Sequence, residues 1–213
     1  MIQVAPSILS ADFLHLENDV EMVNTYADLF HLDIMDGVFV PNLSYGFPVV
    51  EAIAKMAKKP LDTHLMIIQP EKYVERFVKA GSSMVSFHLD ATKDPDAVLE
   101  LIRRCGAKAG LVINPDIPVD RLFPHLKNCD YILLMSVFAG FGGQKFIEDT
   151  YVRIEELRAE IIAQGLDIPI EVDGGVSAAN AGKLIEAGAE ILVAGSAVFN
   201  ADSPADVIAA MRG

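Results

Sequence analysis

The sequence predicts an α/β protein in which eight parallel strands alternate with helices, a single (β/α)8 TIM barrel. Three observations support this fold class. Short β-rich runs alternate with amphipathic stretches along all 213 residues, no linker or low-complexity tract divides the chain, and no second domain is evident. Eight units of similar length favour a closed parallel eight-stranded barrel over a doubly wound open sheet. Residues 1–213 are therefore expected to form one domain.

The strands are expected at residues 3–8, 29–35, 61–66, 84–88, 107–112, 131–137, 168–173 and 191–194. Helical segments are expected between them, at residues 13–25, 48–58, 70–80, 95–105, 119–124, 149–164, 179–187 and 204–211. Gly81, Gly106, Gly165 and Gly188 lie where four of these helices should end, and prolines begin several of them. In such a barrel, the loops that follow the strands build the functional site.

Composition and charge exclude several classes of function. Hydrophobic residues make up 52% and charged residues 22%, as in an ordered chain with a sizeable core. No apolar run approaches the ~20 residues of a membrane span, and the first residues do not resemble an export signal. A net charge of −13 without a basic stripe argues against nucleic-acid or anionic-membrane partners. Cys105 and Cys129 are expected to be reduced packing residues, which indicates a cytoplasmic location.

Polar side chains gather at the ends of three expected strands. With a period of two, His31 and Asp33 of the second strand share one face, and Leu32 and Ile34 share the other. His64 ends the third strand and Asp173 ends the seventh, so two imidazoles and two carboxylates should converge inside the barrel mouth. Any one of them alone could be a satisfied interior polar residue. Burying all four without a cation is costly, so together they predict a divalent metal site.

The loops after the sixth, seventh and eighth strands are rich in glycine. Such loops expose backbone N–H groups and often form a phosphate site in this fold. Because a chain of charge −13 would repel a phosphate, local N–H groups are the expected means of capture. A dinucleotide motif fits poorly, since Lys145 occupies the third glycine position. The candidate residues are Gly140, Phe141, Gly142, Gly143, Gly174, Gly175, Gly195 and Ser196.

Several other residues have weaker claims. Met35, Met66 and Met135 lie at strand ends, where soft packing at the top of the core is the favoured interpretation and a wall of the metal pocket the alternative. His88 ends the fourth strand and could be structural or functional. Asp36 is explained by a hydrogen bond within its loop.

Five segments together resemble the ribulose-phosphate 3-epimerase family. They are Pro6–Phe13, His31–Asn42, His64–Met66, Gly140–Gln144 and Val172–Val176, and they occur in the family's order and spacing across nearly the whole chain. The resemblance implies a TIM-barrel isomerase that interconverts D-ribulose 5-phosphate and D-xylulose 5-phosphate in the pentose phosphate pathway.

The resemblance also implies residue roles. His31, Asp33, His64 and Asp173 would bind one divalent cation, which is iron, zinc, manganese or cobalt in family members. Asp33 and Asp173 would be the proton acceptor and donor. Ser7 and His64 would contact the ketose phosphate, and Gly140–Gly143, Asp173–Gly175, Gly195 and Ser196 would line its pocket. A homo-oligomer is expected, because dimers and larger assemblies are common in this fold family.

One segment departs from the family pattern. The loop after the sixth strand usually begins Asn-Pro-Gly-Phe, whereas this chain has Phe138-Ala139-Gly140-Phe141. The predicted metal ligands are unaffected, so the predicted reaction type is unchanged. The replacement of Asn-Pro by Phe138-Ala139 leaves the closure of this loop and the preferred sugar undetermined. The alternatives are a 3-epimerase of a six-carbon ketose phosphate such as D-allulose 6-phosphate, a non-catalytic sugar-phosphate binding barrel and a metal-dependent hydrolase.

Overall fold

Eight parallel strands form one sheet in the computed structural model, which describes residues 1–213. The strands are β1 (Gln3–Pro6), β2 (Phe30–Met35), β3 (Leu61–Met66), β4 (Ser82–His88), β5 (Lys108–Ile113), β6 (Tyr131–Met135), β7 (Ile170–Asp173) and β8 (Ile191–Ala194). Their order in the sheet is β1-β8-β7-β6-β5-β4-β3-β2. A parallel bridge between Ser7 and His31 joins the two outer strands, so the sheet closes into the predicted barrel.

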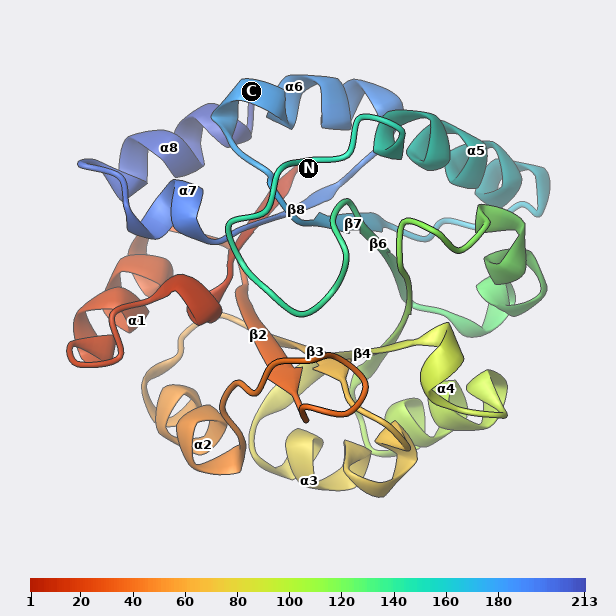
Figure 1. Cartoon of the computed structure of the whole chain (residues 1–213), viewed down its shortest axis with the longest axis horizontal. Coiled ribbons are helices and arrows are strands. Elements are labelled where there is room, and N and C mark those ends of the chain that lie inside the picture. The colour runs from red at the N-terminus through yellow and green to blue at the C-terminus, as the bar shows by residue number, and fades with distance from the viewer.

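Helices surround the strands as an outer ring (Figure 1). The α-helices are α1 (Leu16–Tyr26), α2 (Phe47–Met56), α3 (Val74–Lys79), α4 (Pro95–Arg104), α5 (Thr150–Ala163), α6 (Ala178–Ala187), α7 (Ser196–Phe199) and α8 (Pro204–Met211). Short 3₁₀ segments are η1 (Ile8–Ser10), η2 (Pro70–Lys72), η3 (Leu89–Ala91) and η4 (Val119–Asn128). Between β5 and β6 the chain forms η4 in place of an α-helix, and Pro124 lies inside that segment.

The structure corrects several expected boundaries. The strand expected at 3–8 ends at Pro6, because Ser10 N–H donates to the carbonyl of Ser7 and turns the chain into η1. The strand expected at 168–173 begins at Ile170, since Pro169 has no N–H to donate to a ladder. The strand expected at 131–137 ends at Met135. Three short helical turns, η1, η3 and α7, were not predicted.

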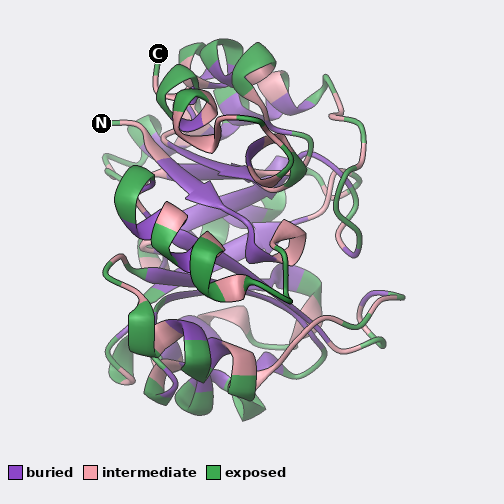
Figure 2. Cartoon of the chain, turned by 90° about the vertical axis from the view of Figure 1, so that its left-hand side faces the viewer, coloured by how far each residue is buried: buried purple, intermediate pink, exposed green.

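The barrel has two apolar compartments. A cluster of 48 buried residues, which includes Leu32 and Ile34, fills the space between strands and helices. Figure 2 shows this arrangement, with buried strands inside and exposed residues on the outer helix surfaces. The barrel interior holds a smaller apolar cluster, formed by Ala5, Leu29, Met84, Tyr131, Ile191 and Val193. Alternation along β2 leaves His31 and Asp33 pointing into the interior, as the sequence predicts.

Two further expectations concern the chain as a whole. Cys105 and Cys129 are both free thiols, as predicted, and Cys129 is buried. None of the helices has the length and apolar character that crossing a bilayer requires.

Candidate metal centre and substrate cavity

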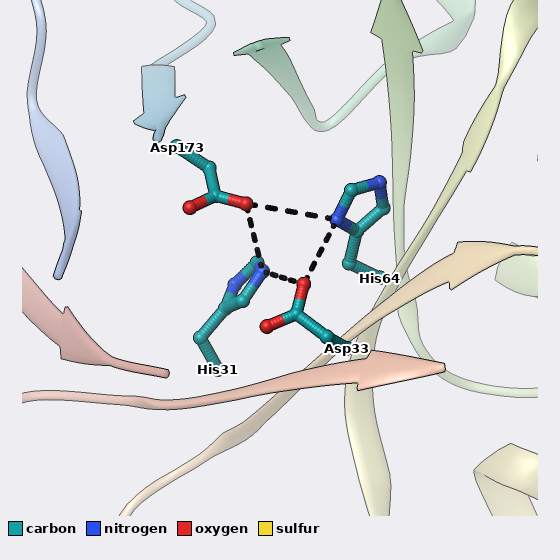
Figure 3. A group of neighbouring side chains, drawn as sticks. All are labelled: His31, Asp33, His64 and Asp173. Atoms are coloured by element: carbon teal, nitrogen blue, oxygen red, sulfur yellow. Dashed lines mark ion pairs between the residues drawn. The ribbon is translucent and has the colours of Figure 1, made fainter. Parts of the chain in front are cut away.

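Four side chains from three strands meet at the carboxyl end of the barrel (Figure 3). His31 Nε2 lies 3.5 Å from Asp33 Oδ1 and 3.8 Å from Asp173 Oδ2. His64 Nδ1 lies 3.4 Å and 3.9 Å from the same two oxygens. One ligand atom from each residue lies within 4.8 Å of all the others. The structure therefore brings together all four predicted metal ligands, with the two carboxylates at opposite corners of the group.

The donor set fits a divalent cation. His31 Nε2 and His64 Nδ1 are buried and have no hydrogen-bond partner, although buried polar atoms are nearly always paired. Both nitrogens point toward the two carboxylate oxygens (Figure 3). A cation between these four atoms would supply the missing partner for both nitrogens and offset the carboxylate charge. Mixed imidazole and carboxylate ligands suit several first-row divalent metals.

The protein groups alone make the two aspartates electrostatically different. Burial would raise the pKa of Asp33, but the adjacent imidazoles of His31 and His64 hold it well below its usual range. Burial raises the pKa of Asp173, and the charge of Asp33 raises it further, to about 7. Burial lowers the pKa of His31, yet the carboxylates of Asp33 and Asp62 outweigh burial and raise it well above its usual value.

Asp33 is also held from outside the metal group. Ser7 Oγ donates to Asp33 Oδ2 at 2.5 Å, and the backbone N–H of Asp33 donates to the Tyr45 hydroxyl at 3.2 Å. Ser44 Oγ donates to the Asp33 carbonyl at 2.6 Å and accepts from Met35 N–H at 3.0 Å. These bonds fix both the backbone and one carboxylate oxygen, so the other oxygen is free to face the centre.

A second polar layer lies beneath the metal group. Asp62 precedes His64 by two residues and Glu171 precedes Asp173 by two, so period-two alternation turns both carboxylates into the barrel. Both side chains are 0% exposed. His31 Nδ1 lies 2.7 Å from Asp62 Oδ2 and 3.3 Å from Glu171 Oε1. Neither residue was predicted from the sequence as part of the site, although the period that located His64 and Asp173 also points to them.

A cavity of about 360 Å³ opens above the centre. Of the four metal-site residues, only Asp33 and Asp173 line it, while His31 and His64 are completely buried. The substrate contact predicted for His64 therefore stays a prediction. All the other predicted substrate residues line the cavity, namely Ser7, Gly140, Phe141, Gly142, Gly143, Gly174, Gly175, Gly195 and Ser196. Met35, Met66 and Met135 line it as well.

The loop between β6 and α5 crosses the strand ends (Figure 1). Gly140 has φ +127°, and a Cβ there would lie 3.3 Å from Cβ of Val40. Asn42 Nδ2 donates to the Gly140 carbonyl at 2.8 Å, which ties this loop to the loop after β2. Gln144 Nε2 donates to the carbonyls of Phe138 and Phe141 and folds the loop on itself. The glycines thus allow a tight loop that the neighbouring chain holds over the cavity.

Part of the cavity wall is built from glycines and small polar side chains. Gly175 has φ +62°, and a Cβ there would lie 2.7 Å from Phe146 N. A Cβ on Gly195 would lie 2.5 Å from Ser10 Oγ. Ser10, Ser177 and Asn200 also line the cavity, and sequence reasoning missed them. No lysine or arginine is among the lining residues, and the expected capture of phosphate by local N–H groups stays a prediction.

Two of the weaker candidates have defined surroundings. Asp36 accepts hydrogen bonds from the backbone N–H groups of Val38, Phe39 and Ile68, so its predicted role within the loop is confirmed. His88 is buried, and its Nε2 lies 2.9 Å from His64 Nε2. Burial and the charge of His64 hold the pKa of His88 well below its usual value.

Fold and site together define a (β/α)8-barrel enzyme with a histidine–aspartate metal group beneath a cavity of about 360 Å³. A sequence model described as the ribulose-phosphate 3 epimerase family matches residues 3–199. The chain belongs to this metal-dependent family, and the resemblance predicted from its motifs is confirmed.

Relatives named ribulose-phosphate 3-epimerase match almost the whole chain. The protein of Synechocystis sp. is 50% identical over 99% of this chain and 93% of its own length. The protein of Bacillus subtilis is 45% identical over 100% of this chain and 99% of its own length. The protein of Escherichia coli is 44% identical over 98% of this chain and 94% of its own length.

Two solved structures of low sequence identity share the fold. The 3-hexulose-6-phosphate synthase of Salmonella typhimurium superposes with a TM-score of 0.73 at 16% identity, covering 99% of this chain and 96% of the other. KGPDC of Streptococcus mutans superposes with a TM-score of 0.74 at 12% identity, covering 100% of this chain and 96% of the other. These likenesses establish the barrel fold alone.

Proposed function

We propose that residues 1–213 form a single catalytic domain that interconverts D-ribulose 5-phosphate and D-xylulose 5-phosphate, a step of the pentose phosphate pathway. One observation carries the proposal. Asp33 and Asp173 are the two members of the metal group that also line the cavity, and they come from strands on different sides of the barrel. A substrate in the cavity therefore lies within reach of two carboxylates at opposite corners of one metal group.

Epimerisation at C3 requires removal of the proton beside the C2 carbonyl and its return to the opposite face. In this proposal one aspartate accepts the C3 proton and the other donates a proton from the other side of the planar enediolate. The roles exchange in the reverse direction. Ser7 Oγ, which donates to Asp33 Oδ2, orients that carboxylate so that its second oxygen, Oδ1, faces the metal group.

His31, Asp33, His64 and Asp173 would hold the divalent cation, proposed to be iron, zinc, manganese or cobalt. When bound, the cation would polarise the C2 carbonyl and offset the negative charge that develops after proton removal. The phosphate is proposed to bind N–H and hydroxyl groups of Gly175, Gly195 and Ser196, which line the cavity. Ser7, the Gly140–Gly143 segment and Gly174 would enclose the sugar.

The cellular location, the assembly state and the partners are proposed as the sequence predicts them. We propose that the protein acts in the cytoplasm as a homo-oligomer on a small ketose phosphate, with no nucleic-acid partner.

Phe138 and Ala139 line the cavity at the positions where the family usually has Asn-Pro. This observation keeps a six-carbon ketose phosphate as a second candidate substrate. Assays of D-ribulose 5-phosphate and D-allulose 6-phosphate, side by side, decide between them. A higher kcat/KM for the five-carbon sugar is expected, and the reverse order would assign the second activity.

The test of the proposed function combines metal analysis with an epimerase assay in D₂O. The purified protein is expected to contain one divalent ion per chain, to lose activity on chelation and to regain it with added metal. Deuterium should enter the product at C3 while the phosphate ester and the carbon chain stay intact, which excludes the hydrolase. Absence of both epimerisation and C3 exchange in the metal-loaded protein would favour the non-catalytic binding barrel.

A further inference from the structure

Each histidine of the metal group has a second ring nitrogen that faces away from the centre. The outer nitrogen of His31 is Nδ1, which lies 2.7 Å from Asp62 Oδ2, and both side chains are 0% exposed. Tyr131 donates its hydroxyl to the other oxygen of Asp62 at 2.8 Å. Because a carboxylate oxygen accepts, this contact places the imidazole proton on Nδ1 and leaves the Nε2 lone pair facing the centre.

The outer nitrogen of His64 is also occupied by a buried residue. His64 Nε2 lies 2.9 Å from Nε2 of His88, and neither ring is more than 2% exposed. When His64 donates from Nε2 and His88 accepts, the lone pair of His64 is on Nδ1. His64 Nδ1 is the buried atom without a partner that faces Asp33 and Asp173. His31 therefore faces the centre with Nε2, and His64 faces it with Nδ1. In each ring the outer nitrogen carries the proton and contacts the buried partner, so the inner nitrogen is free to bind the cation.

We propose that Asp62 and His88 are positioning residues, which fix the nitrogen that each histidine presents to the cation. This inference rests on the metal site of the proposed function and extends it to two residues outside the ligand set. Neither residue lines the cavity, so neither contacts substrate. Each acts through the imidazole that it holds. A partner that fixes the tautomer and ring orientation of a ligand typically contributes about 10–100-fold to metal affinity.

The two positioning residues differ in strength. Asp62 offers a charged acceptor, which Tyr131 orients, whereas His88 offers a neutral imidazole nitrogen. Hydrogen bonds to an ionised acceptor are roughly twice as strong as neutral ones. Removal of the Asp62 acceptor should therefore weaken metal binding more than removal of the His88 acceptor.

The experiment measures Co²⁺ affinity by competition with a chelator, together with the visible spectrum of bound Co²⁺, which reports ligand geometry. Asp62→Leu and His88→Leu remove the acceptors and are expected to raise the Kd by about 10–100-fold. Asp62→Asn and His88→Gln retain a neutral acceptor and are expected to recover part of the loss. The Co²⁺ Kd is expected to rise more in Asp62→Leu than in His88→Leu. In Asp62→Asn and His88→Gln it should rise less than in the corresponding leucine variant.

Thr63→Val is the matched control. Thr63 precedes His64 on β3, is completely buried, and its Oγ1 forms a 2.7 Å hydrogen bond with Ser82 Oγ on the opposite face of the strand. The control should lower the melting temperature of the metal-free protein and leave the Co²⁺ Kd within about twofold. A positioning variant should instead reduce the gain in stability that Co²⁺ produces, because that gain depends on [L]/Kd.

Wild-type affinity and an unchanged Co²⁺ spectrum in Asp62→Asn and His88→Leu would overturn the inference. Two Co²⁺ ions per wild-type chain would also overturn it, since Asp62 would then be a ligand. If Asp62→Leu does not fold, the His88 pair and Asp62→Asn decide the question. Failure of the proposed function looks different, because in that case the wild-type protein itself would bind no Co²⁺ or would bind it without epimerase activity.

Discussion

The Asn42 side chain donates a 2.8 Å hydrogen bond to the carbonyl of Gly140, a residue 98 positions later in the chain. This bond joins the loop after β2 to the loop after β6 at the mouth of the cavity. Gly140 packs against Val40 at the same place, where an added Cβ would lie 3.3 Å away. The loop that encloses the cavity is therefore fastened to the segment that follows His31 and Asp33 of β2, two of the proposed metal ligands.

Asn42→Ala should weaken this fastening and lower kcat/KM for D-ribulose 5-phosphate. A single hydrogen bond contributes about 1 kcal/mol, which corresponds to roughly fivefold. Limited proteolysis should also cut the 138–144 loop faster in the variant. Asn18→Ala, an exposed change on α1, serves as the control and should alter neither measurement. Unchanged kinetics and unchanged proteolysis in Asn42→Ala would mean that the bond does not hold the loop.

The two aspartates of the metal group should have separable roles in proton transfer. Asp33→Asn and Asp173→Asn are each expected to reduce turnover by about 10²–10⁴-fold, the usual contribution of a general acid or base. Each variant should still exchange the C3 proton of one epimer with D₂O and lose exchange from the other, because a base remains on only one face of the sugar. NMR of recovered substrate measures this exchange.

Metal content must be measured in both variants, since both residues are also proposed ligands. Asp167→Asn, an exposed change outside the cavity, provides the control. A metal-loaded variant with turnover near wild type would remove its aspartate from the mechanism. Loss of exchange from both epimers in one variant would point to a single base that serves both faces.

Substrate phosphate should bind at Ser196 and the glycines beside it. Ser196→Asp places a negative charge in the cavity, where no lysine or arginine lines the wall to compensate it. The KM for D-ribulose 5-phosphate should rise by at least about tenfold, roughly 1.4 kcal/mol, while Co²⁺ affinity stays unchanged. Ser203→Asp adds the same charge just before α8, outside the cavity, and should leave the KM unchanged. A normal KM in Ser196→Asp would place the phosphate elsewhere.

Much of the barrel could be predicted because buried strands leave simple signals. β3 (Leu61–Met66) and β8 (Ile191–Ala194) have the predicted bounds, since Pro60 and Gly195 interrupt the apolar runs at their ends. α7 was missed, because its 4 residues are too few to show a helical period. The strand expected at 3–8 extended into the first residue of η1, since the turn that ends β1 depends on a backbone hydrogen bond that composition does not reveal.

The site shows the same division between local and long-range signals. Period-two alternation along β2 placed His31 and Asp33 on one face, and the structure has them there. Asp62 was available by the same argument but became meaningful only through the register that pairs it with His31 on the neighbouring strand. Asn42 bonds to the loop that covers the cavity, and Ser10 lines the cavity, both through contacts between separate segments of the chain. No periodicity encodes such contacts, so the sequence could not assign them.

Asp36 should make stability depend on pH in the acid range. Burial alone would raise its pKa, but three backbone N–H bonds, from Val38, Phe39 and Ile68, outweigh burial and lower it below its usual value. A depressed pKa in the folded state means that the ionised carboxylate stabilises the fold above the unfolded pKa of about 3.9. This contribution is lost as the pH falls through the lower, folded value.

Asp36→Asn should therefore reduce the free energy of unfolding at pH 7 by about 1 kcal/mol, because the amide retains one acceptor and turns a donor toward Ile68 N–H. At about pH 2.5, where the wild-type carboxyl is increasingly protonated, the difference between the two proteins should shrink. Urea titrations of both metal-free proteins at the two pH values measure it, with Asp167→Asn as the exposed control. A difference that is the same at both pH values would mean that Asp36 stabilises its loop without its charge.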